Sequence, residues 1–239
     1  MRMAPAVSHY ESFQLKLERR FSHGLSLLAS YTASKTLDRG IDFQDPSNYM
    51  DNKGLASFDT PQRLVVSYIY QLPFGRKKAF GKSWNWAEDA ALGGWQVTGI
   101  TTYQAGLPFS PSITSTLDNG NSNWPNRICN GKISNWTINA YYDWSCFVSP
   151  PANVFGNMGD NPLRGPGFRD WDVGLMKDFN FTESRYLQFR AEFFNLPNNE
   201  NFGQPASSQC GGACGEGIIT SNASGSNPRE IQFALKFYF

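Results

Sequence analysis

The chain has 239 residues, a formal net charge of +1 and an aromatic content of 15%. A charge so close to zero gives no indication of a nucleic-acid partner or of an electrostatically steered one. No apolar run approaches the roughly 18 residues of a membrane-spanning helix, and the first residues lack the apolar segment of a signal peptide.

Apolar and polar residues alternate with a period of two in several stretches, whereas helical periodicity is nearly absent. The alternation predicts an all-β fold, an antiparallel meander of about seven strands. We place these strands at residues 8–21, 25–35, 63–74, 95–106, 169–179, 185–195 and 229–239. Only residues 83–92, SWNWAEDAAL, are compatible with a helical turn or two.

One side of each predicted strand is almost entirely aliphatic and aromatic. These apolar stripes take every second residue of 13–17, 25–31, 64–72, 95–103, 171–179, 187–193 and 231–239. The opposite side carries polar residues such as Lys16, Gln188 and Glu192. In a β-sandwich the stripes would meet in a shared core. In a membrane barrel they would face lipid, and the polar side would line a wet lumen.

The connections between the predicted strands alternate in length. The long ones cover residues 36–62, 106–168 and 196–228, and the shorter ones cover 21–24, 73–94 and 180–184. In an antiparallel meander the long connections therefore gather at one end of the sheet. Outer-membrane barrels have this asymmetry, with short periplasmic turns and long extracellular loops, and it favours the barrel over the sandwich.

Aromatic residues lie near the ends of the apolar stripes and form two candidate girdles. If the C-terminus is periplasmic, the outer girdle is Tyr31, Tyr103, Trp171 and Phe193, and the inner one is Tyr70, Trp95, Phe179 and Phe239. Amphipathic rings favour this depth in a membrane. The pairs Trp95–Tyr103 and Trp171–Phe179 each span ~20 Å vertically at ~40° tilt, near the ~25 Å apolar band. Lys177 interrupts one stripe, and we expect it to extend toward the inner interface.

The chain ends on REIQFALKFYF, a regular alternation that stops on an aromatic residue. This ending resembles the C-terminal insertion signal of bacterial outer-membrane proteins. The candidate signal residues are Phe233, Leu235, Phe237 and Phe239. The resemblance implies recognition by the barrel-assembly machinery. The alternative is a buried edge strand that happens to end on Phe.

Four stretches resemble the closing barrel strands of TonB-dependent outer-membrane receptors. They are YTASKTLD, FDTPQRLVVSYIYQLPFG, GGWQVTGITTYQAGLPFSP and LQFRAEFFNLPNNENFGQP. The similarity covers almost the whole chain from about residue 10 onward, and it is greatest to the Oar-like subgroup that bears a carboxypeptidase regulatory domain. It implies an integral outer-membrane barrel of about 22 strands around an N-terminal plug, driven through TonB, with extracellular long loops and a periplasmic C-terminus.

Residues 1–239 are therefore expected to be a C-terminal fragment of the barrel domain. Neither the plug nor the TonB-contacting N-terminal region of the family has a counterpart in this sequence. Seven strands also leave two open edges, which hydrocarbon does not tolerate. The missing strands and the contact with TonB would then belong to an upstream region.

The four cysteines form two pairs that are close in sequence. Cys129 and Cys146 lie in the longest connection, and Cys210 and Cys214 lie in the last one. Outside the cell, beyond reducing thiol pools, such pairs favour two local disulfides. A tetrahedral zinc site is the alternative, but it needs four ligands. The two histidines lie elsewhere, at the ends of the first predicted strand.

Two loops carry candidate recognition residues. Trp124, Trp136, Tyr141, Tyr142 and Trp144 gather in the longest connection. Their rings can stack on sugars or cover an apolar ligand, or they can pack on one another and order the loop. The first long connection and its border carry four acids, Asp38, Asp42, Asp45 and Asp51, which either bind calcium or are simply solvated.

No set of residues has the spacing of a catalytic, cofactor-binding or metal site, so we predict no enzyme activity and no cofactor. The predicted function is TonB-dependent transport or reception of an unidentified extracellular ligand, with outer-membrane lipid as the immediate partner. One alternative is a passive porin-like or adhesion barrel. The other is a secreted β-sandwich that binds carbohydrate through the aromatic loop.

Overall fold

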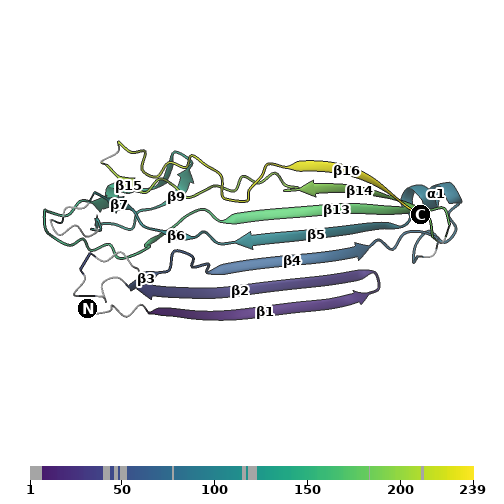
Figure 1. The fold of residues 1–239 in the computed structure, drawn as a ribbon, viewed down its shortest axis with the longest axis horizontal. Coiled ribbons are helices and arrows are strands. Elements are labelled where there is room, and N and C mark those ends of the chain that lie inside the picture. The colour runs from purple at the N-terminus through teal and green to yellow at the C-terminus, as the bar shows by residue number, and fades with distance from the viewer. Residues whose placement is uncertain are drawn as a thin grey trace.

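Seven long strands form one antiparallel sheet in the computed structural model (Figure 1). The structure describes residues 7–39, 44–45, 48, 53–76, 78–114, 117, 123–182, 184–210 and 213–239. In sheet order the long strands are β1 (Ser8–Ser22), β2 (Leu25–Arg39), β4 (Gln62–Gln71), β5 (Trp95–Gln104), β13 (Phe168–Asn180), β14 (Tyr186–Phe194) and β16 (Glu230–Tyr238). All seven predicted strands are confirmed, in the predicted meander order.

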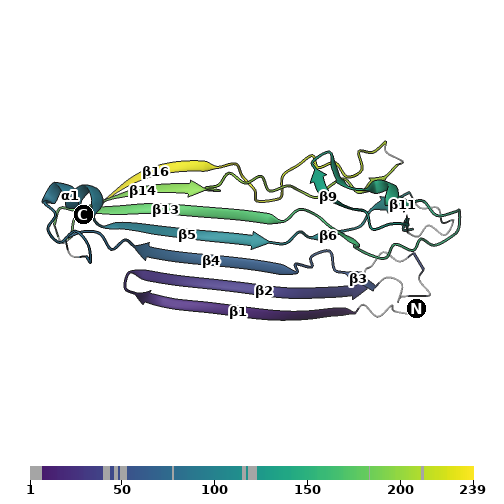
Figure 2. The same cartoon turned by 180° about the vertical axis from the view of Figure 1, so that it is seen from behind.

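The sheet is open in the described part of the chain. β1 and β16 are its two edges, and the short β3 (Lys53–Leu55) pairs only with the end of β2. The front and back views show no other layer over the long strands (Figures 1 and 2). The structure is therefore a curved wall and not a closed barrel.

The remaining elements are short. One helix, α1 (Trp86–Leu92), lies in the connection between β4 and β5, where the sequence predicts helical turns. The loop strands pair as β6 (Pro108–Phe109) with β12 (Leu163–Arg164), β7 (Ser112–Ile113) with β15 (Ser208–Gln209), β8 (Asn126–Arg127) with β11 (Phe147–Val148), and β9 (Lys132–Thr137) with β10 (Ala140–Tyr142). A 3-10 turn, η1 (Trp144–Cys146), precedes β11.

The register places the predicted apolar stripes on one face of the sheet. A single row of directly opposed residues crosses six strands through Leu27, Tyr68, Gly99, Val173, Phe193 and Ile231. Because side chains alternate with a period of two, this row fixes the face of every other residue in those strands. The same register puts Gln188, Arg190 and Glu192 on the opposite face, as the sequence predicts.

The apolar face does not enter a protein core. Phe13 is 62% exposed and Phe233 is 69% exposed, although both belong to apolar stripes. The buried apolar residues of the described chain lie in the loops, with Ala191 as the exception: Ala56, Phe109, Tyr142, Cys146, Phe147, Met158, Leu163 and Ile219. A β-sandwich would bury the stripes against each other, so the sandwich alternative is wrong for the described structure.

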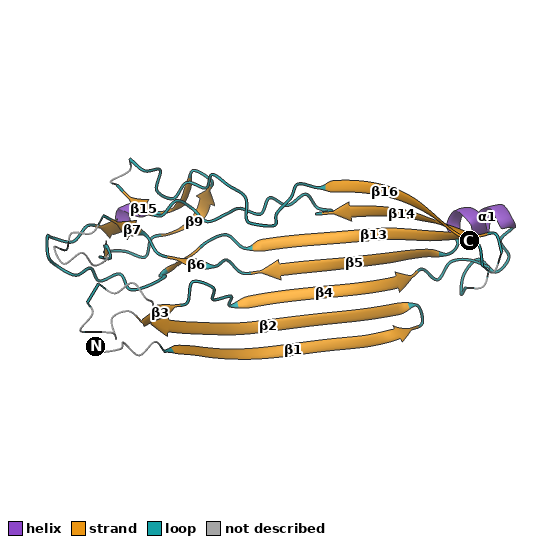
Figure 3. Ribbon diagram, viewed as in Figure 1, coloured by secondary structure: helices purple, strands orange, loops and turns teal. Residues whose placement is uncertain are grey.

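All three long connections leave the same end of the sheet, which we call the loop end (Figure 3). The other end, the turn end, holds α1, the two short turns and the C-terminus. The hairpin between β1 and β2 turns through His23 and Gly24, whose φ angles are 53° and 82°. Two consecutive positive φ angles define the type I′ turn that matches the twist of paired strands.

One predicted strand end and one predicted side-chain position on the apolar face need correction. The strand that carries Tyr31, β2, continues to Arg39, past the predicted end at residue 35. Tyr31 shares a row with Leu64 and Tyr103, and its place in the outer girdle stays a prediction. Beyond Phe13 the same face carries Glu11 opposite Lys35, so the first hairpin extends past the apolar band. Lys177 does not extend freely to the interface. It is 2% exposed and donates to the carbonyl oxygen of Gly93, next to α1.

Candidate functional site

The long loops meet in a small hydrophobic core at the loop end. Its members are Phe109, Tyr142, Cys146, Phe147, Met158 and Leu163. The ring of Tyr142 packs edge-to-face on Phe109 at 5.5 Å and on Phe147 at 5.9 Å between centroids. These contacts order loops that the seven-stranded sheet itself does not support, since an irregular segment needs a core or cross-links to hold one conformation.

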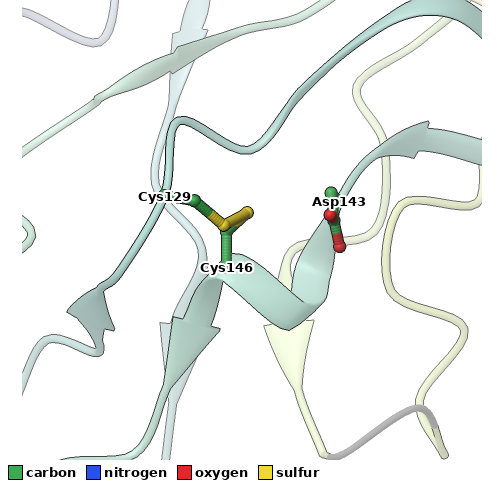
Figure 4. Close-up of side chains that lie close together, drawn as sticks. All are labelled: Cys129, Asp143 and Cys146. Atoms are coloured by element: carbon green, nitrogen blue, oxygen red, sulfur yellow. A yellow bond between two sulfur atoms is a disulfide. The ribbon is translucent and has the colours of Figure 1, made fainter.

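A disulfide joins Cys129 to Cys146 within this core (Figure 4). Asp143 lies close by, and ligand atoms of the three residues are within 4.8 Å of one another. Because the sulfur atoms of Cys129 and Cys146 are bonded to each other, neither is available as a thiolate ligand for a metal ion. The carboxylate of Asp143 accepts from the backbone N–H and the hydroxyl of Ser145, at 3.1 and 2.6 Å. Asp143 therefore caps η1.

The second disulfide joins Cys210 to Cys214, and the buried residue Glu216 lies next to it. The backbone N–H groups of both cysteines donate to the carboxylate of Glu216, at 2.6 and 3.2 Å. Burial raises the pKa of Tyr142 to about 12, the charge of Glu216 adds to this rise, and a hydrogen bond from Gln209 opposes it. Tyr142 is therefore a neutral phenol. Its hydrogen bond with Gln209 joins the last loop to the loop core.

An ion pair joins the first long loop to the second. Asp59 has a fully buried carboxylate, which accepts from the guanidinium of Arg164 and, at 2.5 Å, from the backbone N–H of Thr36. Arg164 also donates to the carbonyl oxygens of Asp59 and Gly106, both at 3.3 Å. The interaction thus ties together residues that are about a hundred positions apart in the chain.

The five loop aromatics do not form one surface. Tyr142 is buried, and Trp124 and Tyr141 pack against the loop core. Trp136 is partly exposed and packs edge-to-face on Tyr141 at 4.8 Å. Trp144 is similarly exposed in η1. Three of these rings thus order the loops, and only Trp136 and Trp144 have the exposure that contact with a ligand requires.

A cavity of about 390 Å³ opens beside Trp136. Tyr141, Lys132 and Arg164 also line it. The Tyr141 hydroxyl donates to the carbonyl oxygen of Arg164 at 3.0 Å, and burial raises the pKa of this phenol to about 12. The cavity offers aromatic surface and one lysine, which suits a ligand with both apolar and polar groups.

A second cavity of about 460 Å³ lies where the polar face of the sheet meets the loops. Arg63, Thr102 and Gln104 contribute from β4 and β5, and Phe202 and Asn222 contribute from the last loop. None of the described lining residues is acidic. No pattern in the sequence indicates this cavity. The side-chain alternation places Thr102 and Gln104 on the polar face, but it gives no information about which loop residues join them.

The polar face carries hydrogen-bonded side chains across neighbouring strands. Arg190 pairs with Glu192 at 2.5 Å, and the amide of Gln232 donates to the same carboxylate. This face is less uniformly polar than predicted. Leu28, Ile69 and Ile100 project from it and are exposed in the described structure.

The acidic loop yields no site in the described residues. Asp38 lies in β2 opposite Gly54, and Asp45 lies in the first long loop. Asp42 and Asp51 lie outside the described residues. The calcium hypothesis therefore stays a prediction.

A family model described as an outer membrane beta barrel domain matches residues 1–232. No curated protein and no solved structure matches the chain. In the part of the chain that the structure describes, no helix has the length and apolar character needed to cross a membrane.

Proposed function

The chain belongs to the outer membrane beta barrel domain family, and on that premise we propose that it forms the closing part of a TonB-dependent transporter. As an outer-membrane barrel protein, it presents its apolar stripes to lipid and its polar face to the lumen. The observation that carries the assignment of faces is the unbroken apolar row from Leu27 to Ile231, which faces no protein core among the described residues.

The step from barrel to transporter rests on the four resembling stretches. They fall on β2, β4, β5, β14 and the adjoining loop bases; β2, β4 and β5 are neighbours in the sheet, and β13 separates β5 from β14. The first of them precedes, and the second contains, the buried Asp59 that joins two long loops. The four stretches therefore cover three neighbouring strands, the strand before the last one, and the bases of the long loops. The plug and the contact with TonB would come from a region upstream of this chain.

The orientation follows from the same proposal. The loop end faces the outside, and the turn end with the C-terminus faces the periplasm, as in bacterial barrels with long outer loops. Phe233, Leu235, Phe237 and Phe239 then form the insertion signal at the periplasmic rim. The two cavities at the loop end are the places where an extracellular ligand would first meet the protein.

Single-channel conductance of the full-length protein in planar bilayers tests the transporter against a passive barrel. A plugged transporter should show no stable open conductance on its own. Its N-terminal region should bind the periplasmic domain of TonB in a calorimetric titration. A steady open conductance together with no TonB binding would support the porin-like alternative. A closed barrel that does not bind TonB would support an adhesion role.

A further inference from the structure

The connection between β4 and β5, described at residues 73–76 and 78–94, lies at the turn end, and its last residues contact side chains of the apolar face. Trp95 donates its indole N–H to the carbonyl oxygen of Ala91 at 3.0 Å, and the ammonium of Lys177 donates to the carbonyl oxygen of Gly93. Trp95 and Lys177 are direct partners in the register and belong to the lipid-facing stripes. The C-terminal end of α1 is therefore bonded to side chains of the apolar face. Figure 1 shows α1 at the turn end, beyond the ends of the long strands.

Further bonds fix this connection in place. The carboxylate of Asp89 accepts from the backbone N–H of Arg76 at 2.7 Å, and Gly94 N–H donates to the Phe74 carbonyl at 3.2 Å. The guanidinium Nε of Arg76 donates to the carbonyl oxygen of Trp84 at 2.8 Å. Asn85 and Glu88 form a capping box at the start of α1. The segment is thus an ordered projection and not a loose loop.

The ordered segment leaves large apolar side chains uncovered. Phe80 is 60% exposed, Trp86 is 73% exposed and Leu92 is 57% exposed, and no residue of α1 is buried. A helix of seven residues is too short to be stable in water without a packing surface. The hydrogen bond from Trp95 to Ala91 places the C-terminal end of α1, which includes Leu92, at the end of an apolar stripe.

The acidic and basic side chains of the segment differ in their surroundings. The carboxylates of Glu88 and Asp89 accept the hydrogen bonds described above. The side chains of Arg76 and Lys82 are exposed, and the guanidinium of Arg76 donates through its Nε. Exposed cations beside exposed aromatic rings are typical of segments that lie in the headgroup region of an anionic bilayer. A lipid surface therefore matches the segment in both polarity and charge.

We propose that residues 73–94 form an interfacial foot that binds the phospholipid of the periplasmic leaflet. Phe80, Trp86 and Leu92 enter the boundary between headgroups and acyl chains, and Arg76 and Lys82 contact lipid phosphates. The foot also covers Lys177, whose ammonium lies 5.5 and 5.1 Å from the ring centroids of Trp95 and Phe179. The choice of leaflet rests on the orientation given under the proposed function.

The test places a single bimane label at residue 86, through Trp86→Cys, in the full-length protein reconstituted into bilayers with brominated phosphatidylglycerol. We expect strong quenching by lipid brominated near the headgroup and little quenching by aqueous iodide. Val154→Cys is the matched control, because Val154 is an exposed apolar residue at the loop end. Its label should respond to iodide and not to lipid.

A second variant tests the cationic part. Lys82→Gln should reduce the preference of the label for brominated phosphatidylglycerol over brominated phosphatidylcholine by about fivefold, since each cation near an anionic surface contributes about that much. Quenching by iodide alone at residue 86, or equal lipid quenching at residues 86 and 154, would overturn the foot. In asymmetric bilayers, quenching only from the lipopolysaccharide leaflet would overturn the choice of leaflet. None of these results depends on binding to TonB.

Discussion

Trp171 donates its indole N–H to the hydroxyl oxygen of Tyr68 at 3.1 Å, although β5 lies between their two strands. The bond spans Gly99, where an added Cβ would lie 2.4 Å from the Tyr68 hydroxyl oxygen. Both polar groups lie on the apolar face, which we propose meets lipid, where water cannot satisfy them. The bond therefore gives the Trp171 N–H an acceptor on the apolar surface, and it requires a glycine between the two residues.

Removing one partner of this pair should destabilise the barrel, whereas removing both should not. Tyr68→Phe leaves the Trp171 N–H unpaired and should lower the free energy of unfolding by about 1–3 kcal/mol. The double variant Tyr68→Phe/Trp171→Phe should recover most of that loss. Urea unfolding of the full-length protein in lipid vesicles is measured for the wild type, Tyr68→Phe, Trp171→Phe and the double variant. Additive single effects in the double variant would show that the bond contributes nothing.

Gly99→Ala should disrupt the same hydrogen bond between Trp171 and Tyr68. The new methyl group competes with the Tyr68 ring for space, so the ring has to leave Gly99 and its bond to Trp171. We expect a loss of about 1–3 kcal/mol in vesicle unfolding. Combined with Tyr68→Ala, the substitution should cost less, because the ring clash is gone and only the contact of the new Cβ with the Asp172 carbonyl oxygen, at 2.9 Å, remains. An equal loss in both backgrounds would refute the steric explanation.

Lys177 should control the position of α1. Lys177→Met removes the donor to Gly93 and the contacts with the Trp95 and Phe179 rings. The local opening of α1 should become easier by about 2 kcal/mol, measured as faster amide hydrogen exchange over residues 86–93. Lys236→Met is the control, because this lysine lies on the polar face at the edge strand. Unchanged exchange in Lys177→Met would show that α1 is held without it.

The buried pair of Asp59 and Arg164 should govern the order of the loop end. Arg164→Met leaves a fully buried carboxylate without its cation and should destabilise the loops by about 3–5 kcal/mol. Limited proteolysis of the intact barrel should then cut the loops at much lower protease concentration. Lys16→Met breaks an exposed pair with Glu18 and should leave proteolysis unchanged within about 1 kcal/mol. Equal effects of the two variants would contradict the role of the buried pair.

Tyr142 should make the loop end sensitive to alkali. Its pKa rises from 10.0 in the unfolded chain to about 12 in the folded loops. Between these values the unfolded state has lost the phenol proton and the folded state keeps it, so stability falls as pH rises from about 10. Tyrosinate absorbance and loop proteolysis should change together in this range. Tyr142→Phe should reduce the proteolysis change. Identical pH profiles for both proteins would exclude Tyr142 as a cause.

The strands were predictable because their signal is local. Alternation along each segment identified the seven long strands of the sheet, and it also assigned Leu27, Tyr68 and Ile231 to one face. The register then followed from adjacency in a meander. The end point of β2 was not predictable in the same way, since Glu11 and Lys35 continue the extended backbone beyond the apolar band.

The loop end was much less predictable. Tyr142 and Trp136 are near neighbours in sequence, but one is buried against Phe109 and the other borders a cavity. Whether each ring is buried or exposed depends on contacts with segments that are distant in the sequence. Composition does not predict these contacts. The covered position of Lys177 likewise depends on α1, whose placement the strand pattern does not contain.

The proposed membrane barrel requires that one particular face of β16 meets lipid. Spin labels placed singly at residues 231–238 of the full-length protein in vesicles measure directly which face does so. The relaxation of each label is compared with dissolved oxygen, which enriches in hydrocarbon, and with a water-soluble nickel chelate. We predict oxygen maxima at Ile231, Phe233, Leu235 and Phe237, with nickel maxima at the residues between them. The opposite phase, or no alternation, would contradict the assignment of lipid and lumen faces.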